Sequence, residues 1–273
     1  MHTLYNIFFC TCILCLVIAC STSPREQPLA KSPDSVCTVL CDAVEPAIPV
    51  LTDSTGVGNI TTYGSVQDPQ PSAGGACNYG KTQVYNFAAA SVSLAPGDLK
   101  GLWNGGHICG QCVQVRVPSP LGFRSVVVRL MDKCPDAYCG IDLGGAPART
   151  LMGDAPGRYS GEWKYVSCAN QDSVSDGAPS LVVKEGSNAW WALIQVHNGP
   201  GATDSIRYES LDGKHSGTFP WATEAENFFK VPNNILADTA EYILRISYSD
   251  KTQASVVVKG SVLSVENSSI EIP

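Results

Sequence analysis

Two aspartates stand where strand-like segments of this 273-residue chain give way to turns. Asp132 follows two apolar residues, and Asp142 follows Ile141 and comes shortly before a pair of glycines. Scaffolds present reactive groups at such positions, and apolar neighbours raise the pKa of a carboxyl group so that it can act as a general acid. Aspartates that cap turns show the same pattern. The two residues alone therefore leave catalysis and turn capping both open.

Two adjacent tryptophans, Trp190 and Trp191, predict contact with sugar rings. A flat indole can bury the apolar C–H face of a sugar, and Lys184 could hydrogen-bond to its hydroxyl groups. Adjacent residues of a regular strand point to opposite faces, so a strand here would place one indole in the core. A bulge or loop at residues 186–188 would let both rings lie on the surface, so the residues themselves leave both arrangements open.

Composition predicts β-structure around these residues. Only 16% of the residues are charged and the net charge is −7, which argues against a nucleic-acid partner. From residue 56 to 169, short β-branched runs such as 113–117 and 125–130 alternate with Gly/Pro turns, which is typical of a β-barrel or sandwich. Short helices are expected near 96–99 and 147–152, each opening with proline.

The C-terminal part reads as a separate β-domain. No cysteine follows Cys168, and a polar linker spans 172–179. About seven strands in some 95 residues fit an immunoglobulin-like sandwich. The strand-like segments are 180–184, 190–197, 204–209, 241–248 and 255–265.

The N-terminus predicts export. Residues 7–19 form an apolar run too short to span a bilayer, and the run ends in a lipobox-like sequence before Cys20. We expect Cys20 to be lipidated; an ordinary signal peptide cut near Ala19 is the alternative. Residues 21–55, rich in Pro, Ser and Thr, read as a tether. In an oxidising compartment, the eight cysteines beyond the leader are expected to form disulfides.

Several kinds of site are not supported by the sequence. The chain has no P-loop, no dinucleotide fingerprint and no nucleophile elbow. Its four histidines are scattered, which gives little support to a metal centre or a serine-type triad. We expect no cofactor and no metal.

Five segments resemble, in order, the barrel domain of the expansin family: 59–64, 74–80, 109–112, 132–135 and 140–143. Residues 183–198 look like the start of the C-terminal carbohydrate-binding domain of microbial expansins, which implies that Trp190 and Trp191 both lie on the surface. The resemblance covers about 56–273. It implies an all-β fold, with a six-stranded double-psi β-barrel at 56–170 followed by an immunoglobulin-like β-sandwich at 175–273, and one polysaccharide groove across both.

The resemblance also assigns residues. Asp142 matches the essential aspartate of the family, with Thr61, Tyr63 and Asp132 as its neighbours in the groove. Where relatives carry a third planar aromatic residue this chain has Glu226, and Trp221 or Phe228 are the candidate substitutes. The family pattern implies the pairs Cys77–Cys109, Cys112–Cys168 and Cys134–Cys139, which leaves Cys37–Cys41 within the tether. Microbial relatives often carry an aromatic residue where Cys134 stands.

The expected function is non-hydrolytic. Inverting hydrolysis needs an acid and a separate base, and related endoglucanases place the base shortly after a Thr-x-Tyr strand. Here no carboxylate follows Tyr63 before Asp68, although Asp132 is a conceivable substitute. We expect a protein that loosens non-covalent contacts between glycan chains. The alternatives are an endoglucanase, a peptidoglycan lytic transglycosylase, or a carbohydrate-binding lipoprotein with an inert barrel.

The expected partner is a neutral cell-wall polysaccharide such as cellulose, xyloglucan or another β-glucan. Residues 171–273 carry 7 basic and 13 acidic residues, a net charge of −6, which repels anionic pectin. We expect an extracellular monomer, secreted or held at the cell surface, that meets a membrane only through the lipid anchor. Asn59 and Asn267 begin glycosylation sequons, and a glycan at Asn59 would crowd the groove beside Thr61.

Overall fold

The computed structural model describes residues 50–92, 102–120, 122–136, 138–236 and 238–273. The predicted leader with its lipobox, Cys20, Cys37, Cys41, the helix near 96–99 and most of the tether lie outside the described residues. The last six residues assigned to the tether, 50–55, belong instead to the first strand of the barrel.

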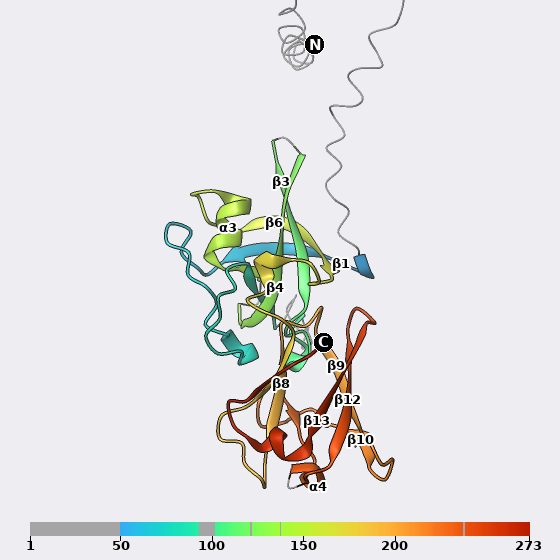
Figure 1. Cartoon of the computed structure of the whole chain (residues 1–273). Helices are drawn as coiled ribbons and strands as arrows, with labels where there is room; N and C mark the ends of the chain where they lie inside the picture. The colour runs from blue at the N-terminus through green and yellow to red at the C-terminus, as the bar shows by residue number, and fades with distance from the viewer. Residues whose placement is uncertain (1–49, 93–101, 121, 137, 237) are drawn as a thin grey trace, which may run out of the picture. The chain divides into compact units, whose positions relative to one another are not determined.

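Six strands of the described chain close into a barrel, as predicted. Their order around the barrel is β1-β5-β2-β4-β3-β6, in which β1 pairs with β5 and β2 with β4 in parallel and the other neighbours are antiparallel. Closure leaves no unpaired sheet edge. The strands are β1 (Val50–Thr62), β2 (Phe87–Ser91), β3 (Cys112–Ser119), β4 (Gly122–Cys134), β5 (Ile141–Leu143) and β6 (Tyr159–Val166) (Figure 1).

The barrel interior is filled by apolar side chains of its own strands. Ile60, Val113, Val115 and Leu130 are fully buried there. Helix α3 (Gly145–Met152), predicted near 147–152, contributes apolar side chains of its own to the same core. Such packing fixes the backbone at the strand ends, where the polar candidate residues lie.

Three disulfides join the described cysteines, and they are the predicted pairs Cys77–Cys109, Cys112–Cys168 and Cys134–Cys139. The first ties the short 3-10 turn η2 (Gly75–Cys77) to the segment before β3. The second joins Cys112, the first residue of β3, to Cys168, two residues after the end of β6. Each bond restricts the unfolded chain, an effect of about 2–4 kcal/mol in typical cases.

The C-terminal half is the predicted sandwich of two sheets. One has the strand order β10-β9-β12-β13 and the other β11-β8-β7-β14. Along β12 every second residue is buried, including Tyr242, Leu244 and Ile246, so one face of this sheet forms the core. The strands are β7 (Ser180–Val183), β8 (Leu193–His197), β9 (Thr203–Ser210), β10 (Ser216–Thr218), β11 (Phe229–Lys230), β12 (Glu241–Tyr248), β13 (Gln253–Lys259) and β14 (Ser269–Glu271).

Two predicted strands are shorter than the sequence pattern indicates. The segment 190–197 becomes a strand only at Leu193, because a tight turn precedes it. The segment 255–265 leaves the sheet at Gly260 and continues as the 3-10 turn η5 (Gly260–Ser264). A Cβ atom at Gly260 would lie 2.3 Å from the carbonyl oxygen of Ile235, in helix α4 (Asn233–Leu236), so the close approach of α4 requires glycine there.

The barrel and the sandwich belong to one compact unit, Ile48–Pro273. The buried guanidinium of Arg129 in β4 donates to the carbonyl oxygens of Val174, Gly110 and Gly199, at 2.7, 3.1 and 3.0 Å. These acceptors come from the linker, the barrel and the sandwich respectively, so one side chain connects all three. Among the residues that the structure describes, no helix is long and apolar enough to cross a membrane.

Candidate functional site

Four residues of the barrel lie in one row across neighbouring strands. Thr61 of β1 is in register with Asp142 of β5, Asp142 with Ala89 of β2, and Ala89 with Asp132 of β4. Residues in register on adjacent strands point to the same face of a sheet, about 4.8 Å apart. The Cα atoms of Asp142 and Asp132 are therefore roughly 10 Å apart, on one face of the barrel wall.

Asp142 is half-buried and directly partnered. The hydroxyl of Thr61 donates to its Oδ1 at 2.6 Å. Burial raises the pKa of the Asp142 carboxyl above its ordinary value of 3.8, and the negative charges of Asp136 and Asp132 raise it further, while the Thr61 hydroxyl acts in the opposite direction. Asp142 is thus a carboxyl group that holds its proton to higher pH than a free one.

Asp132 is fixed by the backbone beside it. Its Oδ1 accepts the N–H groups of Ala76, in η2, and of Lys133, each at 2.8 Å. The carboxyl lies so close to η2 that a Cβ atom at Gly75 would be 2.5 Å from its Cγ, so only glycine fits there. Two backbone donors on one oxygen fix the orientation of this side chain.

The residue between the two aspartates in the row is buried. Ala89 is 2% exposed and packs against Cys134 and Cys139. Cys134 is in register with Ser91 on β2, so the Cys134–Cys139 disulfide lies beside the row, two residues beyond Asp132 on β4.

The loop that this disulfide closes presents an aromatic residue which the sequence reasoning missed. Tyr138 is 60% exposed, and its backbone is held firmly: its N–H donates to Asp136, and its carbonyl oxygen accepts the side chains of Asn59 at 2.6 Å and Arg158 at 3.1 Å. Asn59 lies two residues before Thr61 on β1, so the loop adjoins the row. The signal was present in the sequence, because Tyr138 is the one aromatic residue between the paired cysteines.

The same contact bears on the first sequon. The side-chain nitrogen of Asn59, to which a glycan would be attached, is the atom that donates to Tyr138. A glycan there would replace one of the two hydrogens on this nitrogen and would lie against the loop that carries Tyr138. Asn267, in the second sequon, is exposed.

Tyr63 also lies at this site. It follows β1 directly, its side chain is 46% exposed, and its ring meets Phe87 edge-on at 5.9 Å between centroids. Desolvation raises the pKa of the Tyr63 hydroxyl well above its ordinary value, and the charges of Asp132 and Asp142 raise it further. The phenol is therefore a permanent hydrogen-bond donor, close enough to both aspartates for their charges to act on it.

The two adjacent tryptophans occupy different environments at one turn. Backbone bonds in both directions join Asn188 and Trp191, and the side chain of Asn188 accepts the N–H of Trp190 at 2.9 Å. This turn places Trp190 at its tip, 83% exposed. Trp191 is half-buried against Leu193, with its Nε1 donating to Glu224 at 3.3 Å. The predicted turn exists, but it leaves only Trp190 fully open to solvent.

The other residues predicted for carbohydrate contact differ among themselves. The prediction for Phe228 is wrong, because this ring is 4% exposed and packs with Leu193 and Ala222. Trp221 is half-buried and stacks on His107, with centroids 4.1 Å apart, so packing occupies one of its faces. Lys184 is half-buried, with its Nζ donating to the carbonyl oxygen of Glu185.

Glu226, which the resemblance aligns with an aromatic position of the family, pairs with Lys133 of the barrel at 3.2 Å. Both side chains are about 40% exposed, and surface ion pairs of this kind contribute little stability, typically 0–1 kcal/mol. Glu226 therefore makes a charged contact between sandwich and barrel. Within the described part of the chain, no group of three or more His, Cys, Asp or Glu side chains could hold a metal ion.

Comparison with known proteins gives relatives in sequence and in fold. No family model matches the chain. Over 155 residues it is 29% identical to Expansin-like protein 1 of Dictyostelium discoideum, a match that covers 52% of this chain and 51% of that protein. The chain thus spans about half the length of the curated relative it matches.

Two crystal structures of the expansin of Clavibacter michiganensis share the fold. The apo structure superposes with a TM-score of 0.54 at 22% identity, and a mutant in complex with cellohexaose with a TM-score of 0.54 at 21% identity. Each match covers 76% of this chain and 91% of the other. The resemblance predicted from the ordered motifs is confirmed.

Proposed function

We propose that this chain, which is similar to expansin-like proteins in sequence and in fold, binds cell-wall glucan and loosens the non-covalent contacts between glucan chains without cutting them. The proposed ligand class is cellulose or another neutral β-glucan, and the cellohexaose in the complex of the Clavibacter expansin supports it. The acidic C-terminal half supports a neutral rather than an anionic polysaccharide.

Exposed rings supply the binding step. Trp190, Tyr138 and Tyr63 are 83, 60 and 46% exposed, and a glucan can lay its C–H faces on such surfaces. Trp190 contributes the largest open face. Trp191 closes the turn that carries Trp190, and the exposed part of the Trp191 ring enlarges the surface offered to the glucan. Lys184 supplies a hydrogen-bond donor for the sugar hydroxyl groups. We propose that the barrel (56–170) and the sandwich (175–273) both contact the same polysaccharide.

Asp142 supplies the loosening step. Its carboxyl group, oriented by Thr61, forms a hydrogen bond to a glucan hydroxyl, and the Tyr63 phenol donates a second. Glucan chains in a wall are held together by hydrogen bonds of the same kind, so these two groups compete with them. The exchange breaks no covalent bond and leaves the polysaccharide chemically unchanged.

The fixed carboxyl of Asp132 is the observation that carries the non-hydrolytic proposal. Inverting hydrolysis requires a base that holds a water molecule on the face of the sugar opposite the acid. Oδ1 of Asp132 instead accepts the backbone N–H groups of Ala76 and Lys133. We therefore assign Asp132 to holding the turn η2 in place rather than to priming water.

Extension of a cellulose-rich wall strip under constant load tests this proposal. Wild-type protein should extend the strip, and Asp142→Asn should abolish the extension while it keeps binding to cellulose. Trp190→Ala should reduce both. If Asp142→Asn extends the strip as well as wild type does, the role assigned to Asp142 is wrong.

One observation favours hydrolysis as a second candidate. Carboxyls of inverting enzymes are about 6.5–9.5 Å apart, and the roughly 10 Å between the Cα atoms of Asp142 and Asp132 is compatible with that range. In this case Asp142 would be the acid and Asp132 the base. New reducing ends in soluble glucan, lost in Asp132→Asn, would decide for it.

We propose an extracellular location. The three disulfides among the described cysteines fit an oxidising compartment. The leader supplies the route, and lipidation of Cys20 would hold the protein at a cell surface.

A further inference from the structure

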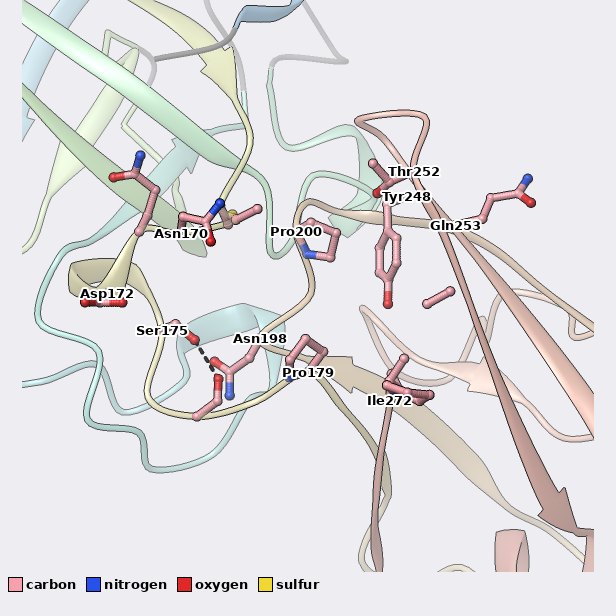
Figure 2. A pocket seen from close by; sticks show the side chains of 16 residues that line it. Asn170, Asp172, Ser175, Pro179, Asn198, Pro200, Tyr248, Thr252, Gln253 and Ile272 are labelled. Carbon is pink, nitrogen blue, oxygen red and sulfur yellow. Dashed lines mark hydrogen bonds between the residues drawn. The ribbon is translucent and has the colours of Figure 1, made fainter. Parts of the chain in front are cut away.

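A separate hollow lies where the linker after Cys168 meets the sandwich. Its volume is about 480 Å³, within the range of roughly 300–1,000 Å³ that small-molecule sites occupy. The wall comes from the linker, the turn after β8, the β12–β13 hairpin and the end of β14 (Figure 2). Asp142, Asp132, Tyr63 and Trp190 do not line this hollow.

Tyr248 of β12 gives this hollow an unused donor. Its side chain is 2% exposed, and its hydroxyl has no hydrogen-bond partner among the residues that the structure describes. In Figure 2 the hydroxyl points toward Pro179 and Ile272, two residues of the same wall. A buried hydroxyl without a partner is rare and unfavourable. Burial, with the nearby charge of Asp250, raises the pKa of Tyr248 to about 12, so the group remains a donor at neutral pH.

The rest of the wall indicates the chemistry of a ligand. Side-chain amides of Asn170, Asn198 and Gln253 offer both donors and acceptors, and Pro179, Pro200 and Ile272 offer apolar surface. Among the described residues that line the hollow, none is Lys, Arg or His, and Asp172 adds a negative charge. A ligand that carries hydroxyl groups and apolar C–H faces, but no anionic group, would match such a wall.

We propose that this hollow is a second carbohydrate site, which binds a neutral mono- or disaccharide unit. In this site the Tyr248 hydroxyl donates a hydrogen bond to the sugar. The site is independent of the groove beside Asp142, because the two share none of the residues that define them. A protein with both sites would hold a glycan at two places on its surface. Binding at one place does not depend on the chemistry at the other.

Amide NMR titration of the full chain with cellobiose tests the proposal. Saturable shifts are expected at Asn198 and Gln253. Tyr248→Phe keeps the ring and should weaken binding between about two- and tenfold, the effect of one neutral hydrogen bond. Gln253→Ala, at an exposed position on the rim, should also weaken it. Tyr165→Phe removes a tyrosine hydroxyl from the barrel and is the matched control, with unchanged affinity.

A variant of the proposed glucan-binding surface, Trp190→Ala, distinguishes binding at the two sites. Trp190→Ala should leave the pocket shifts and their midpoint unchanged, whereas loss of cellulose binding in that variant concerns only the groove. The proposal is overturned if cellobiose at tens of millimolar produces no saturable shift at the pocket, or if Tyr248→Phe binds as wild type does. Tighter binding of glucuronate than of cellobiose would overturn the neutral ligand class.

Discussion

Replacement of Trp190 by alanine gives the most quantitative prediction for the proposed glucan-binding surface. An indole side chain presents up to about 250 Å², and Trp190 is 83% exposed, so roughly 200 Å² faces solvent. A glucan ring covers one face of the indole, about 100 Å². At about 25 cal/mol per Å², Trp190→Ala should weaken cellohexaose binding by about 2.5 kcal/mol, or roughly 70-fold.

Isothermal titration calorimetry with cellohexaose measures this change. Phe123→Ala is the matched control, because Phe123 is also an exposed aromatic residue, at 60%, but lies on the β3–β4 hairpin outside the site. The control should bind within twofold of wild type. If Trp190→Ala also binds within twofold, the exposed indole is not a sugar platform and the groove must be assigned to other residues.

Three further predictions concern stability. Because burial raises the pKa of Asp142 above 3.8, the folded wild type binds this proton more tightly than the unfolded chain does, and its free energy of unfolding falls as pH rises above 3.8. Urea unfolding at a series of pH values above 3.8 should therefore show Asp142→Asn gaining stability relative to wild type. If the free energies of unfolding of the two proteins change equally with pH, the prediction is wrong. Burial lowers the pKa of His197 from 6.5 to about 4, so stability present above pH 6.5 should fall by roughly 3 kcal/mol as pH drops to 4, and His197→Gln should remove that dependence. Arg129→Met leaves three carbonyl oxygens without their donor and should lower the free energy of unfolding by about 3 kcal/mol, seen in calorimetry as a melting point lower by roughly 6–12 °C; an unchanged melting point would refute the connecting role of Arg129.

The fold and the aspartate site were largely predictable from the sequence. Ordered motifs and cysteine spacing carried the barrel and its disulfides through the resemblance to expansins. The same motifs placed Thr61 beside Asp142. In the structure β1 and β5 are parallel neighbours, and Ile60 pairs with Ile141, which sets Thr61 opposite Asp142.

The positions of single aromatic side chains were not predictable. Phe228 and Phe229 are adjacent, and strand alternation would expose one of them; both are buried because β11 has only two residues and Phe228 turns into a separate apolar cluster. The tight turn at Asn188 exposes Trp190 and half-covers Trp191, which no period in the sequence indicates. The cysteine spacing places Tyr138 in a short loop, but the position of that loop beside Asn59 depends on a tertiary hydrogen bond that no local pattern indicates.

The fate of the glycosidic bond tests the central claim most directly. Cellohexaose would be incubated with the protein in heavy-oxygen water and followed by mass spectrometry, with wild type, Asp142→Asn and Asp132→Asn in parallel. Intact, unlabelled hexasaccharide is expected in every sample, even where wild type extends wall strips. Shorter oligosaccharides that carry the heavy oxygen, formed by wild type and absent with either variant, would contradict it.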